Sequence, residues 1–140
     1  MAKLSAADLV RIRDAKAKES SFQDKIYCMI CGGTGCHATG SISVKEALEK
    51  EITEKQLSEK VKLVETGCNG FCAMGPILVV QPEGVFYQKL SAEDIPELVE
   101  SHLIGHQPVE RLLYKDSVSK KRVEKQEDIA FFAYQKPIAL

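Results

Sequence analysis

The chain has 140 residues and a mass of 15.5 kDa, enough for one domain with a small extension. Nineteen Lys and Arg against twenty Asp and Glu leave a formal net charge of −1, which argues against a protein that mainly coats nucleic acid or acidic lipid. No segment approaches the roughly 20 apolar residues of a membrane span. Five cysteines, an odd number, cannot all form internal disulfides. The cysteines are therefore the feature to explain.

Residues 1–22 are expected to form an N-terminal helix, regular over about residues 5–19. Ser5 stands three residues before Asp8, the spacing of a capping box, in which the hydroxyl accepts a backbone N–H and the carboxylate reaches back to the cap. The same spacing at Ser43 and Ser91 predicts two further helix starts. The first residues are charged and amphipathic with no apolar signal core, so we expect a cytoplasmic protein.

Strands are predicted where β-branched and aromatic residues gather, in residues 25–30, 61–66, 77–80 and 85–87. The last two are separated by Q-P-E-G, and Gly84 suits the positive φ of a tight hairpin. Together with the helices after Ser43 and Ser91, the order is β-α-β-β-β-α. This order predicts an α/β fold with one small mixed sheet and helices packed on it, over residues 23–105.

Residues 106–140 differ from the rest of the chain. Nine of the fourteen residues 115–128 are charged and no apolar stripe runs through them, which is typical of a solvated linker. Residues 129–140 are an apolar tail, with nine apolar residues out of twelve. We expect such a tail to pack on the domain or on another protein chain.

The cysteines form two pairs, Cys31-Gly-Gly-Thr-Gly-Cys36 and Cys68-Asn-Gly-Phe-Cys72, and each pair follows a predicted strand directly. Because the carboxyl ends of parallel strands emerge at one edge of a sheet, the two loops should face each other there. Four thiolates would then converge on one point, which is the geometry of a metal site.

Four thiolates admit either zinc or an iron–sulfur cluster. Structural zinc sites usually hold each half by short gaps in rigid knuckles, whereas a two-iron cluster is a wider object that each pair can embrace one iron at a time. Glycines in both loops can adopt positive φ and turn backbone amides toward the cluster, where they tune its reduction potential. These residues are Gly32, Gly33, Gly35 and Gly70. The pattern favours a [2Fe-2S] cluster, with zinc or a metal-free pair of redox thiols as the alternatives.

Cys28 stands outside the two pairs but forms a C-x-x-C spacing with Cys31. One interpretation is a thiol–disulfide oxidoreductase that uses these two residues, and the other is a buried strand thiol that behaves as a small apolar residue. A thioredoxin pair opens a helix, whereas two glycines follow Cys31, so the second interpretation is favoured. His37 follows Cys36 directly and is expected to be an ordinary histidine near the surface rather than a ligand.

The quoted cysteine loops, followed by P-E-G-V-F-Y and S-A-E-D-I-P-E-L-V-E-S-H-L, resemble the thioredoxin-like [2Fe-2S] ferredoxins over roughly residues 24–114. More closely, they are similar to the amino-terminal domain of the NADH-binding flavoprotein subunit of electron-bifurcating and NAD(P)-reducing [FeFe]-hydrogenases. The resemblance implies a thioredoxin-like fold with the four cysteines of the two pairs as cluster ligands. Nothing in the family pattern uses Cys28.

The resemblance also implies a function and partners. The chain would be a one-electron carrier in an NAD(P)H-linked complex, with flavoprotein, iron–sulfur and hydrogenase subunits and a soluble ferredoxin as partners. The large flavin- and NADH-binding domain of such subunits has no counterpart in these 140 residues. No nucleophile–base pair or acidic dyad is evident, so we expect no substrate turnover by this chain. The alternative from another class is a zinc-stapled module that binds a protein partner.

Overall fold

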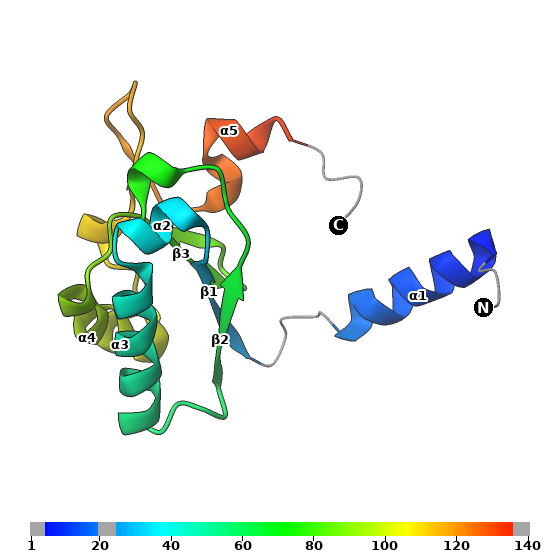
Figure 1. Ribbon diagram of the computed structural model, residues 1–140, viewed down its shortest axis with the longest axis horizontal. Helices are drawn as coiled ribbons and strands as arrows, with labels where there is room; N and C mark the ends of the chain where they lie inside the picture. Colours follow the sequence, from blue (N-terminus) through cyan, green and yellow to red (C-terminus); the bar gives the residue numbers. More distant parts are fainter. Residues whose placement is uncertain (1–4, 20–24, 136–140) are drawn as a thin grey trace.

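The computed structural model describes residues 5–19 and 25–135, with the backbone alone for residues 16–19. The main sheet has four strands in the order β2-β1-β3-β4 (Figure 1). Its strands are β1 (Ile26–Cys31), β2 (Val61–Thr66), β3 (Leu78–Gln81) and β4 (Val85–Tyr87). Strands β1 and β2 are parallel, and the other two pairings are antiparallel. This mixed sheet confirms the predicted strands to within about a residue.

The helices occupy the predicted places between the strands. The crossover from β1 to β2 runs through two helices, α2 (Thr34–Ala38) and α3 (Ser41–Glu54). After the β3–β4 hairpin, in which Gly84 has φ +74°, comes α4 (Ile95–Leu98), which continues into a π-helical turn, Val99–Ile104. The β-α-β-β-β-α order and the α/β fold class are thereby confirmed.

The two faces of the sheet bury different partners. Strand side chains alternate between faces. Helices α3 and α4 lie over one face of the sheet (Figure 1). The core on that face includes Cys28, Ile30, Val44, Leu48, Leu78, Val80, Tyr87, Ile95, Leu98 and Val99. The other face buries Val79 and Phe86 against Tyr114, Ile129 and Phe132, all from the C-terminal part of the chain.

The segment predicted as a linker is solvated but folded. Residues 115–128 are mostly exposed, as their charge predicts, yet they take part in a hairpin of β5 (Tyr114–Lys115) and β6 (Arg122–Val123). The hairpin lies along the outer edge of β4, where the Phe86 N–H donates to the Glu124 carbonyl at 2.8 Å. An edge strand offers unpaired backbone groups to any neighbour, and such pairing leaves no apolar periodicity in the sequence.

The described part of the apolar tail packs on the domain, which is one of the two arrangements expected from the sequence. Ile129 is only 2% exposed, and α5 (Ala130–Ala133) follows it against the open face of the sheet. Residues 136–140 of the predicted tail lie outside the described part of the chain. The predicted division at residues 22 and 105 stays a prediction.

Two of the three predicted capping boxes form. The Ser5 and Ser91 hydroxyls both hydrogen-bond the carboxylate three residues on, at 2.7 Å, and these carboxylates accept the cap N–H groups. The prediction at Ser43 is wrong, because α3 begins at Ser41 with Gly40 as its cap at φ +106°. The short α2 ends immediately before, so a left-handed residue is needed to turn the chain, and glycine adopts it without a steric cost.

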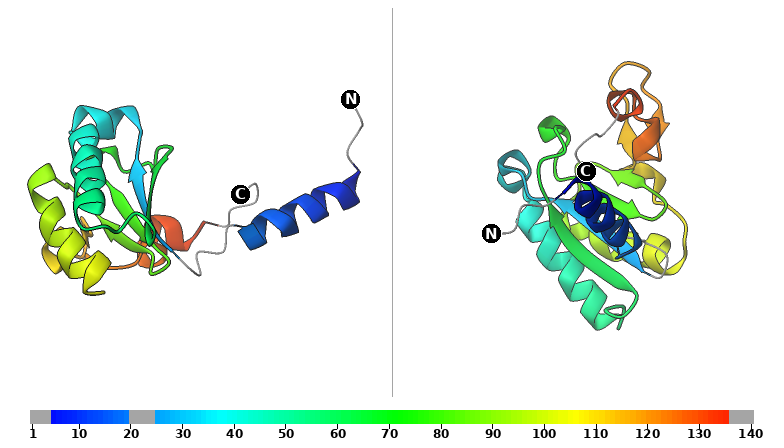
Figure 2. Two further views of the ribbon diagram at one scale, coloured as in Figure 1. Left: turned by 90° about the horizontal axis from the view of Figure 1, so that it is seen from below. Right: turned by 90° about the vertical axis from the view of Figure 1, so that its right-hand side faces the viewer.

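Helix α1 (Ala6–Glu19) confirms the prediction of a helix near the amino terminus. It lies apart from the sheet in Figure 1 and in the left view of Figure 2. Residues 1–4 and 20–22 of the predicted segment lie outside the described residues. Leu9, Val10 and Ile12 are exposed on α1. In the described part of the chain, no helix is long and apolar enough to cross a membrane.

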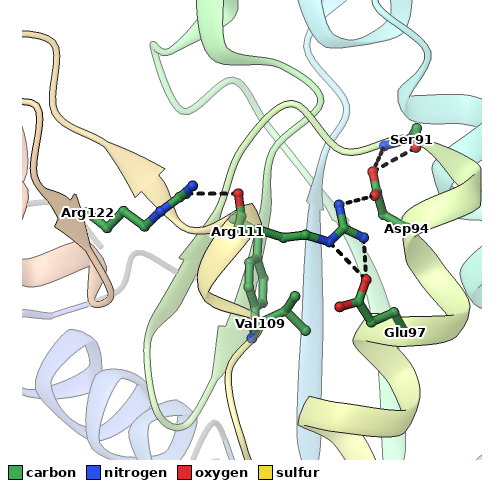
Figure 3. Close-up of polar contacts among 7 residues, drawn as sticks. Ser91, Asp94, Glu97, Val109, Arg111 and Arg122 are labelled. Atoms are coloured by element: carbon green, nitrogen blue, oxygen red, sulfur yellow. Dashed lines mark hydrogen bonds and ion pairs between the residues drawn. The ribbon is translucent and has the colours of Figure 1, made fainter.

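Arg111 fastens the C-terminal part of the chain to α4 (Figure 3). Its guanidinium donates to Asp94 at 2.7 Å and to Glu97, while its backbone carbonyl accepts from Arg122 Nη1 at 2.8 Å. One residue therefore joins the helix layer to the hairpin at the edge of β4.

A buried hydrogen-bond network links β4 to the end of the helix layer. The Tyr87 hydroxyl lies 2.8 Å from His102 Nδ1 and accepts the Val109 N–H at 3.2 Å. Both side chains are buried, and burial is the main cause that lowers the pKa of His102, so the neutral imidazole is favoured. His102 is thus a satisfied core histidine.

Replacing Tyr87 by Phe should destabilise the fold by about 1–3 kcal/mol, because the Val109 N–H and the imidazole lose a buried partner. The urea midpoint of unfolding, followed by circular dichroism, measures the effect. Tyr134→Phe is the control, since Tyr134 is 90% exposed. Equal midpoints for the two variants would contradict a stabilising role of the network.

Candidate metal centre

The parallel pairing of β1 and β2 brings the two cysteine loops together. Cys31 is the last residue of β1 and lies opposite Thr66, the last residue of β2. The chain after β1 runs into α2, which carries Cys36, and the chain after β2 runs into the loop with Cys68 and Cys72. All four predicted ligands therefore belong to one edge of the sheet, as expected.

Two glycines let the first loop lie directly on the second. A Cβ at Gly33 would lie 3.1 Å from Cys68 Cβ, and one at Gly35 would lie 2.9 Å from Cys72 Cβ and 3.1 Å from its sulfur. Real Cβ atoms are almost never as close as 2.9 Å, so only glycine fits at position 35, and at Gly33 a Cβ would force Cys68 to shift by a few tenths of an ångström. The structure thus places each cysteine of the second pair against a glycine of the first loop.

The second loop is shaped around its own sulfur atoms. Cys68 Sγ and Cys72 Sγ are 3.8 Å apart, and the Gly70 N–H donates to Cys68 Sγ at 3.3 Å. Gly70 has φ +82°, the left-handed conformation expected for it from the sequence. Its amide is therefore turned toward the thiols, as predicted.

The remaining glycine expectations are only partly right. Of the four glycines predicted to turn amides toward the cluster, Gly70 is the one with positive φ. Gly32 uses its N–H in a 2.9 Å hydrogen bond to the Thr66 carbonyl. Gly32 thus extends the β1–β2 pairing instead of facing the thiols. Gly35 and Gly33 lack a side chain and so let the first loop approach the second closely. The Gly33 amide also helps to lower the pKa of Cys31.

The protonation of the thiols reflects this environment. Burial raises the pKa of Cys31, but hydrogen bonds from the backbone amides of Asn69 and Gly33 outweigh it, so the net pKa is lowered. Burial, followed by the neighbouring Cys31, raises the pKa of Cys36 to about 11. Adjacent thiols hinder one another's ionisation, and a bound cation removes this obstacle.

This donor set fits a [2Fe-2S] cluster. All four cysteines are free thiols, and they are arranged as two pairs, each within one loop. A two-iron cluster of this kind takes four cysteine thiolates in all. Among the described residues, no three His, Cys, Asp or Glu side chains gather tightly enough to hold a single metal ion.

The two pairs differ in their exposure to solvent. Cys31 and Cys36 are each 1% exposed and belong to the core on the second face of the sheet, whereas Cys68 and Cys72 are exposed. One end of the site is therefore embedded in the domain, and the other end lies at the surface.

Cys28 lies apart from the site. It is fully buried on the face that packs on α3, and Cys31 belongs to the core of the opposite face. Burial raises the pKa of Cys28 to about 12. An attacking thiol needs exposure and a low pKa, so the geometry is that of a structural strand thiol.

His37 is exposed, as expected, and lies beside an ion pair. Its Nε2 is 3.4 Å from Glu65, which also accepts from Lys45 at 2.8 Å. These three side chains line a cavity of about 210 Å³ next to Cys31. The ring is thus directed to Glu65, consistent with a residue that is not a ligand.

Three residues of the site were not predicted. A Cβ at Gly75 would lie 2.9 Å from Cys36 Sγ, the Asn69 amide acts on Cys31, and the Phe71 ring lies among four other aromatic rings. Asn69 and Phe71 lie between two cysteines, so their position in the sequence was a usable signal. For Gly75 only its place before Pro76 marked it as a turn.

Comparisons with known proteins agree with this geometry. A sequence model of the thioredoxin-like [2Fe-2S] ferredoxin family matches residues 19–102. The chain is 42% identical over 77 residues to the 2Fe-2S ferredoxin of Clostridium pasteurianum, covering 55% of this chain and 76% of that protein. It is 46% identical over 79 residues to the 2Fe-2S ferredoxin of Aquifex aeolicus, covering 56% and 71% respectively.

The solved structures show the same relationship. The crystal structure of the wild-type thioredoxin-like [2Fe-2S] ferredoxin from Aquifex aeolicus superposes with a TM-score of 0.59 at 38% identity, covering 64% of this chain and 95% of that chain. None of these relatives is named as a hydrogenase subunit, so that closer resemblance stays a prediction.

The cofactor is thus a [2Fe-2S] cluster rather than the alternative zinc ion, and the match extends over more than half of the sequence. The fold, the paired thiols and the relatives lead to the same conclusion. This chain belongs to the thioredoxin-like [2Fe-2S] ferredoxins, electron carriers that interact with redox partners.

Proposed function

We propose that Cys31, Cys36, Cys68 and Cys72 are the ligands through which this chain holds its [2Fe-2S] cluster. The observation that carries the assignment is the contact between the loops, in which Gly33 lies against Cys68 and Gly35 against Cys72. This contact joins the two thiol pairs into one site.

The bound cluster supplies one-electron redox chemistry, and the chain supplies its environment. By formal charge, a cluster with four thiolates changes from about −2 to about −3 on reduction. Amides directed at the sulfur atoms stabilise negative charge. The N–H groups of Gly33, Asn69 and Gly70 do this at Cys31 and Cys68, so they set the reduction potential.

We infer that electrons cross at the end of the site formed by Cys68 and Cys72. These two residues are exposed, while Cys31 and Cys36 are buried. A redox partner can approach the outer pair most closely. The buried pair anchors the cluster at the core on the second face of the sheet.

In its biological setting, we propose that the chain is an electron-relay module of an NAD(P)H-linked hydrogenase or dehydrogenase complex in the cytoplasm. The support is the resemblance of the T-G-C-N-G-F-C block and of the residues that follow it to the amino-terminal domain of such flavoprotein subunits. Its partners would be flavoprotein, iron–sulfur and hydrogenase subunits, and a soluble ferredoxin.

The relay proposal predicts a flow of electrons from pyridine nucleotide through a flavoprotein. A purified NADH-oxidising flavoprotein with NADH should bleach the visible bands of the oxidised chain under anaerobic conditions. NADH alone should leave these bands unchanged, because no flavin site is predicted within the described residues. Bleaching by dithionite but not by the flavoprotein mixture would contradict the relay.

Replacing Cys72 by Ser should remove or alter the cluster, because one iron loses a thiolate. The visible absorption of anaerobically purified protein and the electron paramagnetic resonance signal after dithionite reduction measure the loss. Cys28→Ala is the matched control, since Cys28 is buried away from the site. A wild-type spectrum in the Cys72 variant, or a lost spectrum in the Cys28 variant, would overturn the ligand set.

Replacing Gly35 by Ala should reduce cluster incorporation several-fold, because the new Cβ would push α2 away from Cys72. Iron and sulfide content per chain after reconstitution measures incorporation. Gly67→Ala is the control: it lies in the second loop, and a Cβ there would have no atom within 4 Å. Equal incorporation by the two variants would show that the close approach of the loops is not required.

A further inference from the structure

The C-terminal part of the chain lies beyond the family match yet covers the metal centre's outer loop. The family match ends at residue 102, whereas residues 114–132 fill the second face of the sheet. Figure 1 shows α5 beside the loop that follows β2, at the end of the sheet where β1 and β2 finish. The position of α5 therefore calls for a function that the shared domain does not supply.

The segment before α5 is firmly attached. The Phe86 N–H donates to Glu124 and the Gln126 N–H donates to Gly84, both at 2.8 Å. Ile129, the residue before α5, is buried in the same core as Cys31 and Cys36. Helix α5 thus begins from a fixed point on the sheet.

From this point α5 places two rings on the loop of Cys68 and Cys72. The Phe71 ring stacks on Phe132 with centroids 5.3 Å apart and meets Phe131 edge-on at 5.1 Å. Phe131 and Phe132 are themselves edge-on at 5.1 Å. Aromatic pairs of this kind are stabilising beyond the area they bury.

Phe131 also lies over the backbone of the loop. A Cβ at Gly70 would be 3.7 Å from Phe131 Cζ, so the ring covers the residue whose amide is bonded to Cys68. The Phe131 side chain is itself 53% exposed. The ring therefore lies between solvent and the loop, with one side exposed to solvent and the other in contact with Gly70 and Phe71.

We propose that α5 is a hydrophobic cap on one side of the cluster's outer loop, with Phe131 as the residue that positions the loop and limits the access of water across Gly70 and Phe71. Cys68 and Cys72 stay exposed on the other side, where a redox partner approaches. The proposal rests on the proposed ligand roles of Cys68 and Cys72. Water around an iron–sulfur cluster stabilises the more highly charged reduced state. The cap therefore keeps the reduction potential low and slows the loss of iron.

Phe131→Ala tests the cap in the full-length, cluster-loaded chain. The variant should lose its visible absorbance to EDTA several-fold faster than wild type, and its reduction potential should shift to a less negative value. Tyr134→Ala is the matched control: it follows α5, is 90% exposed and has no ring contact among the described residues, so it should behave as wild type. Phe131→Leu, which keeps an apolar side chain, should lie between.

The readouts separate the cap from a general loss of stability. Phe131→Ala loses two ring contacts and should melt earlier than wild type, so the loss of absorbance and the potential are measured at a temperature at which circular dichroism shows every variant to be folded. Wild-type kinetics and potential in Phe131→Ala, or the same changes in Tyr134→Ala, would overturn the cap. If Phe131→Ala does not fold, the comparison of Phe131→Leu with Tyr134→Ala decides in the same way. The ligand assignment has its own test, because a wild-type cluster spectrum in Cys72→Ser would count against it whatever the Phe131 variants do.

Discussion

The metal centre depends on the parallel register of β1 and β2. Pairing Cys31 with Thr66 ends both strands at one edge, so that two loops from distant parts of the sequence start side by side. A shift by one residue would turn Cys31 to the opposite face, because side chains alternate along a strand. Cys28 shows the consequence, since it lies three residues earlier in the same strand and belongs to the other core.

The site is graded from the interior to the surface. The inner thiols, Cys31 and Cys36, share a core with the second face of the sheet, and the outer thiols lie in a loop shaped by Gly70. This arrangement suits electron transfer, which requires a firmly held cofactor with one end near a partner. It also leaves the outer loop dependent on contacts from outside the sheet, and the rings of α5 make these contacts.

Local signals in the sequence predicted the elements well, and failed where the neighbouring element decided. The capping boxes at Ser5 and Ser91 form, each at the first turn of the helix that it was predicted to start. At Ser43 the same spacing is present, but α2 ends so close by that Gly40 becomes the cap. Likewise, the charges of residues 115–128 predicted their exposure but not the hairpin, because the pairing uses backbone groups along β4.

The sequence alone predicted a site of four thiols, the order of strands and helices along the chain and the α/β class, because thiol spacing and hydrophobic periodicity are local properties. Only the tertiary structure decided how each glycine serves the site: Gly35 by close approach, Gly70 by its conformation, and Gly32 through the strand ladder. It also decided that the apolar tail lies on Phe71. These outcomes depend on which atoms meet across the fold, and residue spacing along the chain does not encode such distances.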